Sequence, residues 1–446
     1  MIEKLVASLD QMKEKEAAVV LLDALARNST MFEQFDEIAK SYFKIKEYEK
    51  SFRNAEKALS LYSGPNTYDA KYNVLNAANH ANYPERALTL IKQLELIGSS
   101  DSDLQLEKAF ALFLMNQKDK AESVLREQLV NPKNDEQTKT KIRFNLGTYE
   151  LLKDEFQSGL RKFLFEGRKL DYWKKPEFPF ERWEGNIQPG RKIYVRSEAG
   201  IGDEFINIRF MNHLKDAEMR PIWFTERKET AEIFNRCGYE VITNVSDIQT
   251  KDNPTWVHSM DLPVYLNLEY RDLWKGPYLH ANGSSTHIRN GTKPKIGLRW
   301  QGNPAYDHDL HRSIPFAEMF AAVSHIDADF YSLQRDNGME EILGYEDKIT
   351  RLDNHMQSYE DTLSMLSDLD LIITSCTSIG HAAAAMGKET VVITPISAYY
   401  TWCHSSEKSP WYGDNLTLLR QQRPRTWEEP LEELRNLVNM KWGVSN

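Results

Sequence analysis

From residue 191 to the end, the chain alternates short β-branched or aromatic runs with helical stretches, and this alternation constrains the fold most. The runs are KIYVRSE, PIWFTE, YEVIT, TWVHSM, KIGLRW, DFYSLQ, DLIITS and TVVIT. Strands alternating with helices favour parallel sheets with helices on both faces. A Gly-, Ser- and Asn-rich loop at 277–295 divides this region. We therefore expect one doubly wound α/β domain at 191–290 and another at 291–446, with ligands at the carboxyl ends of the strands.

Residues 1–170 show helical spacing of apolar residues and a repeat of about 34 to 38 residues. The segments KIKEYEKS, HANYPERA, NQKDKA and LKDEFQSG each end on a small residue, namely Ser51, Ala87, Ala121 and Gly159. A small residue where two antiparallel helices cross allows close approach, and stacked pairs bury what one pair cannot. The pattern predicts tetratricopeptide-like helical repeats, with an irregular helical bundle as the alternative.

The segment 171–190, DYWKKPEFPFERWEGNIQPG, is rich in proline and aromatic residues and has no helical period. Such composition indicates a linker or a docking segment between the repeats and the first sheet.

Composition excludes several classes of protein. The net charge of -10 argues against a dedicated nucleic-acid or anionic-membrane binder. No run approaches the roughly 20 apolar residues that span a bilayer, and residues 1–20 resemble a charged amphipathic helix rather than a signal peptide. Three scattered cysteines, Cys237, Cys376 and Cys403, cannot form a disulfide framework or a zinc site. We expect a cytoplasmic protein without a transmembrane segment.

The first candidate motif is RSEAGIGDEF, which follows the strand KIYVRSE. Gly200 and Gly202 would allow a tight turn into the next helix, whose first turn would carry Asp203 towards the cleft. A carboxylate there can take a proton from an incoming hydroxyl. Asp203 could instead only cap the helix, which is a common role for Asp. The third glycine of a dinucleotide fingerprint is absent, so a nicotinamide cofactor is not expected.

The second motif is GLRWQGNPAYDHDLHRSIP. A strand ends at Trp300, Gly302 and Asn303 turn the chain, and Arg312 lies in the polar segment that follows. An arginine beside small residues suits recognition of a diphosphate, and an ordinary solvated loop is the alternative. Asp307 and Asp309 resemble a metal-binding pair but have no further acidic ligand at suitable spacing, so we expect no metal.

The third motif is DLIITSCTSIGHAAAAMGK, in which a buried strand leads into a helix of small residues. Hydroxyls and backbone N–H groups at a helix start bind phosphate without a full charge. Thr377, Ser378 and Gly380 would form this loop, and His381 could reach a phosphate or ribose. A lone helical histidine can equally be structural. Gln334, at the end of the strand DFYSLQ, is a further candidate for contact with a base or ribose.

The fourth feature is the aromatic segment SAYYTWCHSSEKSPWY, which follows the strand TVVIT. Aromatic faces stack on bases and sugar rings, so Tyr400, Trp402 and Trp411 could wall the acceptor side of the cleft. They could alternatively seal this domain against the helical repeats.

Together these segments resemble the tetratricopeptide-repeat glycosyltransferases, whose catalytic part is similar to the heptosyltransferases (glycosyltransferase family 9) and, more distantly, to the protein O-GlcNAc transferases. The resemblance rests on RWEG, GIGDEFINIRF, GLRWQGNP with HRSIP, YSLQ, DLIITSCTSIGHAAAAMGK, and the later TP and SPWY, in this order over about 180–420. Cys376 departs from the family pattern, which has Asp there.

The resemblance implies a GT-B type pair of Rossmann-like domains and an inverting, metal-independent glycosyltransferase without a cofactor. Its donor would be a nucleotide-diphosphate sugar held by the C-terminal domain. Asp203 matches the general base, the loop Thr377–His381 matches the donor-diphosphate loop, and Arg312 matches the basic residue after GNP. Trp300, Asn303 and Gln334 would complete the donor side, and Gly200 and Gly202 the acceptor side.

Two interpretations remain open. The chain is either a glycosyltransferase whose glycan, lipid or protein acceptor is presented through the repeats, or a non-catalytic scaffold with a degenerate transferase domain. Nucleic acid is not an expected partner.

Overall fold

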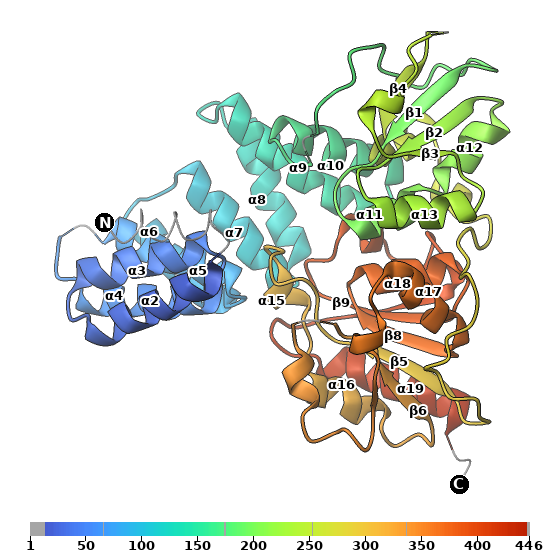
Figure 1. Cartoon of the computed structure of the whole chain (residues 1–446). Helices are drawn as coiled ribbons and strands as arrows, with labels where there is room; N and C mark the ends of the chain where they lie inside the picture. Colours follow the sequence, from blue (N-terminus) through green and yellow to red (C-terminus); the bar gives the residue numbers. More distant parts are fainter. Residues whose placement is uncertain (1–13, 66, 174, 252, 336, 444–446) are drawn as a thin grey trace. The chain divides into compact units, whose positions relative to one another are not determined.

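The computed structural model describes residues 14–65, 67–173, 175–251, 253–335 and 337–443 (Figure 1). Residues 1–13, most of the expected N-terminal amphipathic helix, lie outside this part. The chain divides into two compact units. The first comprises the residues up to Ile142 with Asn303–His311 and Gln422–Thr426, and the second comprises Arg143–Gly302, Arg312–Gln421 and the residues from Trp427 onward.

Helical hairpins form the N-terminal third of the chain, which confirms the predicted repeats (Figure 1). The helices are α2 (Lys15–Asn28), α3 (Phe32–Lys44), α4 (Tyr48–Leu61), α5 (Tyr68–His80), α6 (Pro84–Leu96), α7 (Ser102–Leu114), α8 (Lys118–Val130), α9 (Glu136–Leu152) and α10 (Phe156–Lys169).

The small residues of the repeat lie where the two helices of each hairpin meet. Ser51, Ala87, Ala121 and Gly159 are all buried, near the starts of α4, α6, α8 and α10. A Cβ atom on Gly159 would lie only 2.7 Å from the backbone nitrogen of Leu151 in α9. Five residues before each of them the chain turns through a left-handed residue, namely Lys46, Asn82, Asn116 and Asp154. The repeat therefore encodes both the turn and the close crossing.

The second unit contains a four-stranded parallel sheet among its described residues. Its strands are β1 (Lys192–Arg196), β2 (Arg220–Phe224), β3 (Val241–Ile242) and β4 (Thr255–His258), in the order β3-β2-β1-β4. Its helices include α11 (Ile201–Asn207), α12 (Phe210–Asp216), α13 (Lys228–Arg236) and α14 (Leu262–Tyr265). The strand order reverses between β1 and β4, so the loop after β1 lies at a topological switch point.

The same unit contains a larger sheet, whose described strands run in the order β10-β11-β9-β8-β5-β6-β7 and are parallel except for β10. They are β5 (Lys295–Arg299), β6 (Asp329–Ser332), β7 (Thr350–Arg351), β8 (Leu371–Ser375), β9 (Thr390–Thr394), β10 (Lys408–Ser409) and β11 (Gly413–Arg420). The order reverses between β5 and β8. The loops after these two strands therefore flank the expected ligand crevice.

Helices cover both faces of the larger sheet (Figure 1). α16 (Phe316–Val323) and α19 (Glu428–Trp442) pack with Ile296, Ile373 and Val391 in one hydrophobic cluster. α17 (Tyr359–Asp368) and α18 (Ser378–Ala385) pack in another cluster with Ile372 and Val392, the alternate residues of β8 and β9. This is the doubly wound arrangement that the sequence predicts. All eight predicted strands are present, and β7, β10 and β11 are additional.

The segment 171–190 docks along the edge of the smaller sheet. The Trp183 N–H donates to the Trp256 carbonyl at 2.7 Å, and the Trp256 N–H donates to the Glu181 carbonyl at 3.0 Å. Phe178 and Trp183 are buried. The segment was expected to be either a linker or a docking segment, and these contacts are those of a docking segment.

The units differ from the expected domains. The expected boundary at residue 170 places α10 with the repeats, whereas α10 belongs to the unit that contains both sheets. The physical reason is a buried ion-pair cluster. The Arg168 guanidinium contacts Glu198 at 2.6 Å and also pairs with Asp261, and both carboxylates are fully buried. These acids follow β1 and β4, so α10 is fixed at the carboxyl edge of the smaller sheet.

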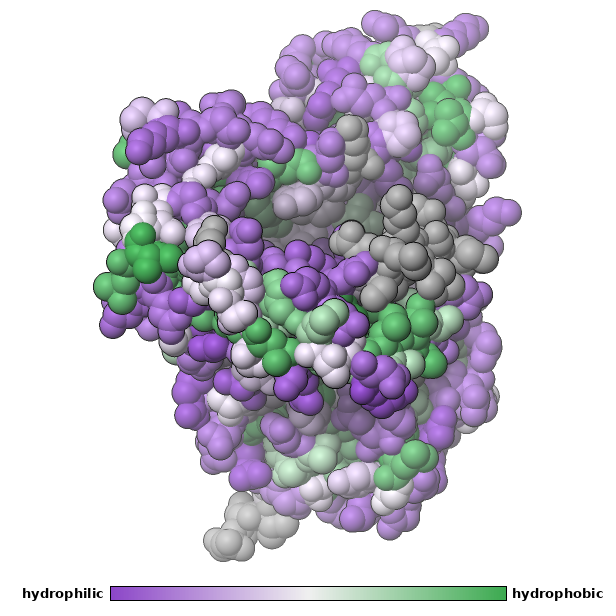
Figure 2. Space-filling model, turned by 90° about the vertical axis from the view of Figure 1, so that its left-hand side faces the viewer, coloured by the Kyte–Doolittle hydropathy of each residue, from purple (hydrophilic) through white to green (hydrophobic). Residues whose placement is uncertain are grey.

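None of the described helices is both long and apolar enough to cross a membrane. Figure 2 shows one face of the molecule, where hydrophilic residues dominate and hydrophobic ones form separate small groups. Scattered apolar side chains of this kind are normal on a protein surface.

Candidate functional site

The start of α18 is the first element of the site, and its backbone donors are left open. The cap residue Thr377 is extended, and its hydroxyl lies 2.9 Å from the Thr374 hydroxyl rather than bonding to the helix. By contrast, α17 is capped by Ser358, which accepts from the Asp361 N–H. Within the described residues, the N–H groups of Ser378 and Ile379 form no hydrogen bond. A helix start with open donors suits an anion.

Small residues bring α18 close to the larger sheet. A Cβ atom on Gly380 would lie 3.0 Å from Val392 Cγ2 and 3.2 Å from Thr374 Cγ2. Residues 382–385, all alanine, are fully buried. The Ser378 hydroxyl, one residue into the helix, lies 2.6 Å from the Tyr359 hydroxyl. The helix start is therefore held at a fixed place beside β8.

His381 is held rigidly and is only 4% exposed. Its ring stacks on Trp402 at a centroid distance of 4.6 Å and an interplanar angle of 3°, and its Nδ1 lies 2.9 Å from the Tyr412 hydroxyl. Burial, followed by the nearby charge of Arg209, lowers the pKa of His381 to about 3. The imidazole is consequently neutral at physiological pH.

Arg312 ends α15 (Asp309–Arg312) and brings a positive charge to the loop before α18. Its Nη1 donates to the Cys376 carbonyl at 2.7 Å. The Cys376 side chain is buried and accepts from the Trp402 indole N–H at 3.1 Å. Burial raises the pKa of the Cys376 thiol, so it remains a neutral packing group. Arg312, Thr377 and Ser378 thus lie together at the β5/β8 switch point.

Asp203 lies in the first turn of α11, after β1, and is 8% exposed. Its Oδ2 accepts from the Gly200 N–H at 2.9 Å, and its Oδ1 accepts from the Tyr399 hydroxyl at 2.9 Å. Burial raises the pKa of Asp203 to about 6, although the hydrogen bonds from Tyr399 and Gly200 oppose the rise. Asp203 does cap its helix, as the simpler interpretation requires, and it is also a carboxylate with increased proton affinity.

The starts of α11 and α18 meet at Gly202. A Cβ atom on Gly202 would lie 3.3 Å from His381 Cδ2 and 3.4 Å from Ser378 Cα. Gly202 is therefore needed for close approach. The left-handed residue of this turn is Ala199, with φ 59°, whereas the cap Gly200 is extended. We expected the two glycines to form the tight turn into α11, but the residue in the left-handed conformation is Ala199.

Three predicted donor residues have side chains that are engaged elsewhere. Trp300 is fully buried and packs against Phe316 at 4.7 Å. The Gln334 amide oxygen accepts from the N–H groups of Trp300 and Gln301, so this buried side chain holds the loop after β5. Asn303 belongs to the first compact unit, where its side chain accepts from the Ala305 N–H at 2.9 Å.

The aromatic residues expected as a ligand wall are buried. Trp402 and Trp411 are 0% and 1% exposed, and Tyr400 is 3% exposed. Trp402 supports His381, while Tyr400 and Trp411 pack against Phe163 and Phe156 of α10. These three side chains therefore form no ligand wall: Tyr400 and Trp411 pack on α10, which belongs to the same unit rather than to the helical repeats of the alternative interpretation.

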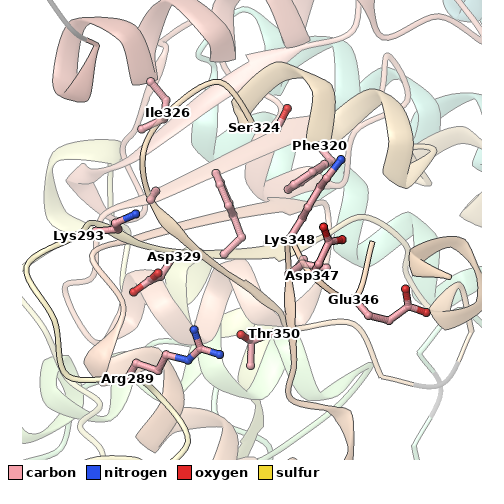
Figure 3. A pocket seen from close by; sticks show the side chains of 13 residues that line it. Arg289, Lys293, Phe320, Ser324, Ile326, Asp329, Glu346, Asp347, Lys348 and Thr350 are labelled. Atoms are coloured by element: carbon pink, nitrogen blue, oxygen red, sulfur yellow. The ribbon is translucent and has the colours of Figure 1, made fainter. Parts of the chain in front are cut away.

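A pocket of about 450 Å³ lies at the opposite edge of the larger sheet (Figure 3). Its lining includes Asp329 and Thr350, the first residues of β6 and β7. Figure 3 shows Arg289, Lys293 and Lys348 beside acidic residues around it. Because it lies at the amino ends of the strands, this pocket is separate from the site at α18.

In the described ranges, no group of three or more His, Cys, Asp or Glu side chains is arranged to hold a metal ion.

Comparisons with known proteins give no match to a protein-family model and none to a curated protein. Among solved structures, an O-GlcNAc transferase mutant of Thermobaculum terrenum is 12% identical over 91% of this chain and 89% of that chain, with a TM-score of 0.33. A heptosyltransferase of E. coli with ADP is 10% identical over 56% of this chain and 98% of that chain, with a TM-score of 0.39. A glycosyl transferase family 9 protein of Veillonella parvula is 13% identical over 54% and 88%, with a TM-score of 0.37. At these values we draw neither the family nor the activity from the similarities.

Sequence reasoning missed Arg209, and it placed Tyr399 and Tyr412 only in the aromatic segment, without their contacts to Asp203 and His381. Arg209 interrupts the apolar run INIRFM, and a lone charge in such a run was an available signal. Tyr399 contacts Asp203 across 196 positions of sequence, and no local pattern encodes that contact.

Proposed function

We propose that this protein is a glycosyltransferase that moves a sugar from a nucleotide-diphosphate donor to an acceptor hydroxyl with inversion. The observation that carries the proposal is the contact at Gly202. It packs the first turn of α11, which carries the buried Asp203, against the open start of α18. A base and an anion-binding helix start on facing elements are the two parts that direct displacement at a sugar carbon requires.

In this proposal the donor diphosphate binds at the N–H groups of Ser378 and Ile379. Arg312 donates a hydrogen bond to the Cys376 carbonyl and so places a positive charge beside these N–H groups. These groups stabilise the negative charge that develops on the leaving nucleoside diphosphate, so the step needs no metal ion.

Asp203 removes the proton from the acceptor hydroxyl as that oxygen attacks the sugar carbon. The new bond forms on the face opposite to the leaving diphosphate, which inverts the configuration. A pKa of about 6 leaves Asp203 ionised at neutral pH while making it a stronger base than an ordinary aspartate. The acceptor must displace the Tyr399 hydroxyl from Oδ1 or share that oxygen with it.

The acceptor class is proposed to be a glycan, lipid or protein delivered through the helical repeats in the cytoplasm. Trp402 and Trp411 do not stack on the donor base in this proposal, because both side chains are buried.

A second function is favoured by one observation. Both Asp203 oxygens already accept hydrogen bonds inside the protein, which a purely structural helix cap would also show. In that case the chain binds nucleotide or glycan without turnover.

A thermal-shift panel of UDP-, GDP-, ADP- and CMP-sugars tests the donor site. At a hundred times the dissociation constant, a bound ligand stabilises by about 2.7 kcal/mol. We expect at least one donor to raise Tm, and Arg312→Met to reduce that rise while the exposed Arg435→Met control retains it. No shift with any donor would remove the donor site from the account.

A further inference from the structure

Arg209 is a buried cation without an acidic partner. It is 3% exposed, and none of the described Asp or Glu side chains forms an ion pair with it. Its guanidinium donates to the carbonyls of Ile206, Leu273 and Trp411 and to the Tyr278 hydroxyl. Burying a charge without a counter-charge is costly, so a role beyond packing is expected.

The guanidinium also faces Tyr412. Its carbon lies 4.4 Å from the centroid of the Tyr412 ring, so a positive charge lies against the ring. This charge acts to lower the pKa of Tyr412, against the effect of burial. The charge therefore makes the Tyr412 hydroxyl a stronger hydrogen-bond donor.

The His381 Nδ1 is 2.9 Å from the Tyr412 hydroxyl oxygen and is an available acceptor. The other group near the Tyr412 hydroxyl is that of Tyr278, which accepts from Arg209 at 2.6 Å and donates to the Phe205 carbonyl at 2.8 Å. A neutral imidazole nitrogen accepts a hydrogen bond more strongly than a phenol oxygen, so the Tyr412 proton goes to Nδ1.

We propose that Arg209, acting through Tyr412, fixes His381 as the tautomer that carries its proton on Nε2. Arg209 and Tyr412 are then positioning residues, and His381 presents one N–H donor of defined direction. The stacking of His381 on Trp402 prevents the ring from turning. The low pKa of His381 keeps the ring neutral, so Nδ1 stays available as an acceptor.

The Nε2 side of the ring faces the junction of α11 and α18. Cδ2, which is bonded to Nε2, is the ring atom closest to the Cβ position of Gly202, at 3.3 Å. In the part of the chain that the structure describes, Nε2 makes no hydrogen bond. The Nε2–H group of His381 is therefore available to donate to a ligand. This last step rests on the proposed function, in which the ligand is the donor diphosphate and its oxygens accept the bond.

Nitrogen NMR of the full chain with ring-¹⁵N-labelled histidine tests the tautomer without any ligand. The signals of His381 are identified by their loss in His381→Gln. We expect Nε2 at the chemical shift of a protonated imidazole nitrogen and Nδ1 at that of an unprotonated one. The wild-type spectrum is enough for this test: a protonated Nδ1, or averaged shifts for the two nitrogens, would overturn the proposal.

Tyr412→Phe removes the hydroxyl and keeps the ring, and we expect it to abolish the tautomer preference. Tyr345→Phe, in the other hydrophobic cluster of the larger sheet, is the matched control and should leave the His381 shifts unchanged. Unchanged shifts in a folded Tyr412→Phe protein would contradict the role of Tyr412. Arg209→Lys, which keeps the charge but loses the planar guanidinium, should also disturb the preference.

Calorimetric titration with UDP, GDP, ADP and inorganic pyrophosphate tests the ligand step. For any of these that binds the wild type, Tyr412→Phe should weaken binding about tenfold, the loss of one hydrogen bond to a charged group. Equal affinity in both proteins would overturn the role of the Nε2–H group. If none of the four binds the wild type, the proposed donor site fails, while the NMR result still decides the tautomer.

Discussion

The Tyr399 hydroxyl donates a 2.9 Å hydrogen bond to Oδ1 of Asp203 and so joins the loop after β9 to the first turn of α11. Tyr399 follows a strand of the larger sheet, and Asp203 follows a strand of the smaller one. The proposed base is therefore held by the sheet that is proposed to bind the donor.

Removing this hydrogen bond should raise the pKa of Asp203 further. The bond stabilises the ionised carboxylate and opposes the effect of burial. In Tyr399→Phe we expect the acidic limb of the kcat profile to move to higher pH by about one unit, because the base must be deprotonated to act. Tyr345→Phe should leave the limb in place. An acidic limb that stays in place in Tyr399→Phe would show that Asp203 does not set it.

The raised pKa of Asp203 also affects stability. Between the ordinary value of 3.8 and about 6, the folded state binds a proton that the unfolded state has released. The free energy of unfolding contributed by Asp203 is therefore greatest at low pH and falls as pH rises through 6. Relative to Asp203→Asn, which does not titrate, the wild type should lose about 1 kcal/mol between pH 5 and pH 7.5. Urea unfolding at the two pH values measures this, and a constant difference would mean an unshifted pKa.

Gly202→Ala should impair turnover more than folding. Its methyl group would lie 3.3 Å from His381 Cδ2 and 3.4 Å from Ser378 Cα, so α11 and α18 must move apart by a few tenths of an ångström. We expect kcat to fall about tenfold or more, since misplacement of reacting groups is costly. Gly291→Ala, which meets only Asp329 Oδ2 at 3.9 Å, is the control. Equal kcat values for the two variants would argue against chemistry at this junction.

Arg168→Met should destabilise the unit that contains both sheets. The change leaves Glu198 and Asp261 buried without this partner, and such losses cost about 3 to 5 kcal/mol. Burial already raises the pKa of Glu198, so this carboxyl would bind a proton in response. Urea unfolding measures the free energy of unfolding of Arg168→Met and of the control Arg161→Met, an exposed position on the same helix. Similar stabilities would contradict the assignment of α10 to this unit.

Local patterns predicted most of the fold. The eight β-branched runs became strands, and Ser51, Ala87, Ala121 and Gly159 marked the helix crossings. The strand GDNLTLLR was missed because it follows the aromatic segment directly, without an intervening helix.

Side-chain exposure could not be predicted in the same way. Trp402 and Trp411 follow a strand end, where ligand contact is common, but their environment is set by α10 and by His381, far away in sequence. Gln334 and Trp300 likewise lie at strand ends but face inward. Motif position identified the loops of the candidate site, whereas long-range packing decided which of their side chains are buried.

The most direct measurement is the release of nucleoside diphosphate from UDP-, GDP- and ADP-sugars, with a cell extract as the source of acceptors. Wild-type protein and Asp203→Asn are compared, and binding of the same nucleoside diphosphate is measured for both. We predict release by the wild type, a loss of at least a hundredfold in Asp203→Asn, and similar binding by the two proteins. Equal release rates for the wild type and Asp203→Asn would contradict a glycosyltransferase that uses Asp203 as its base. Tight binding of the nucleoside diphosphate without release by either protein would contradict it as well.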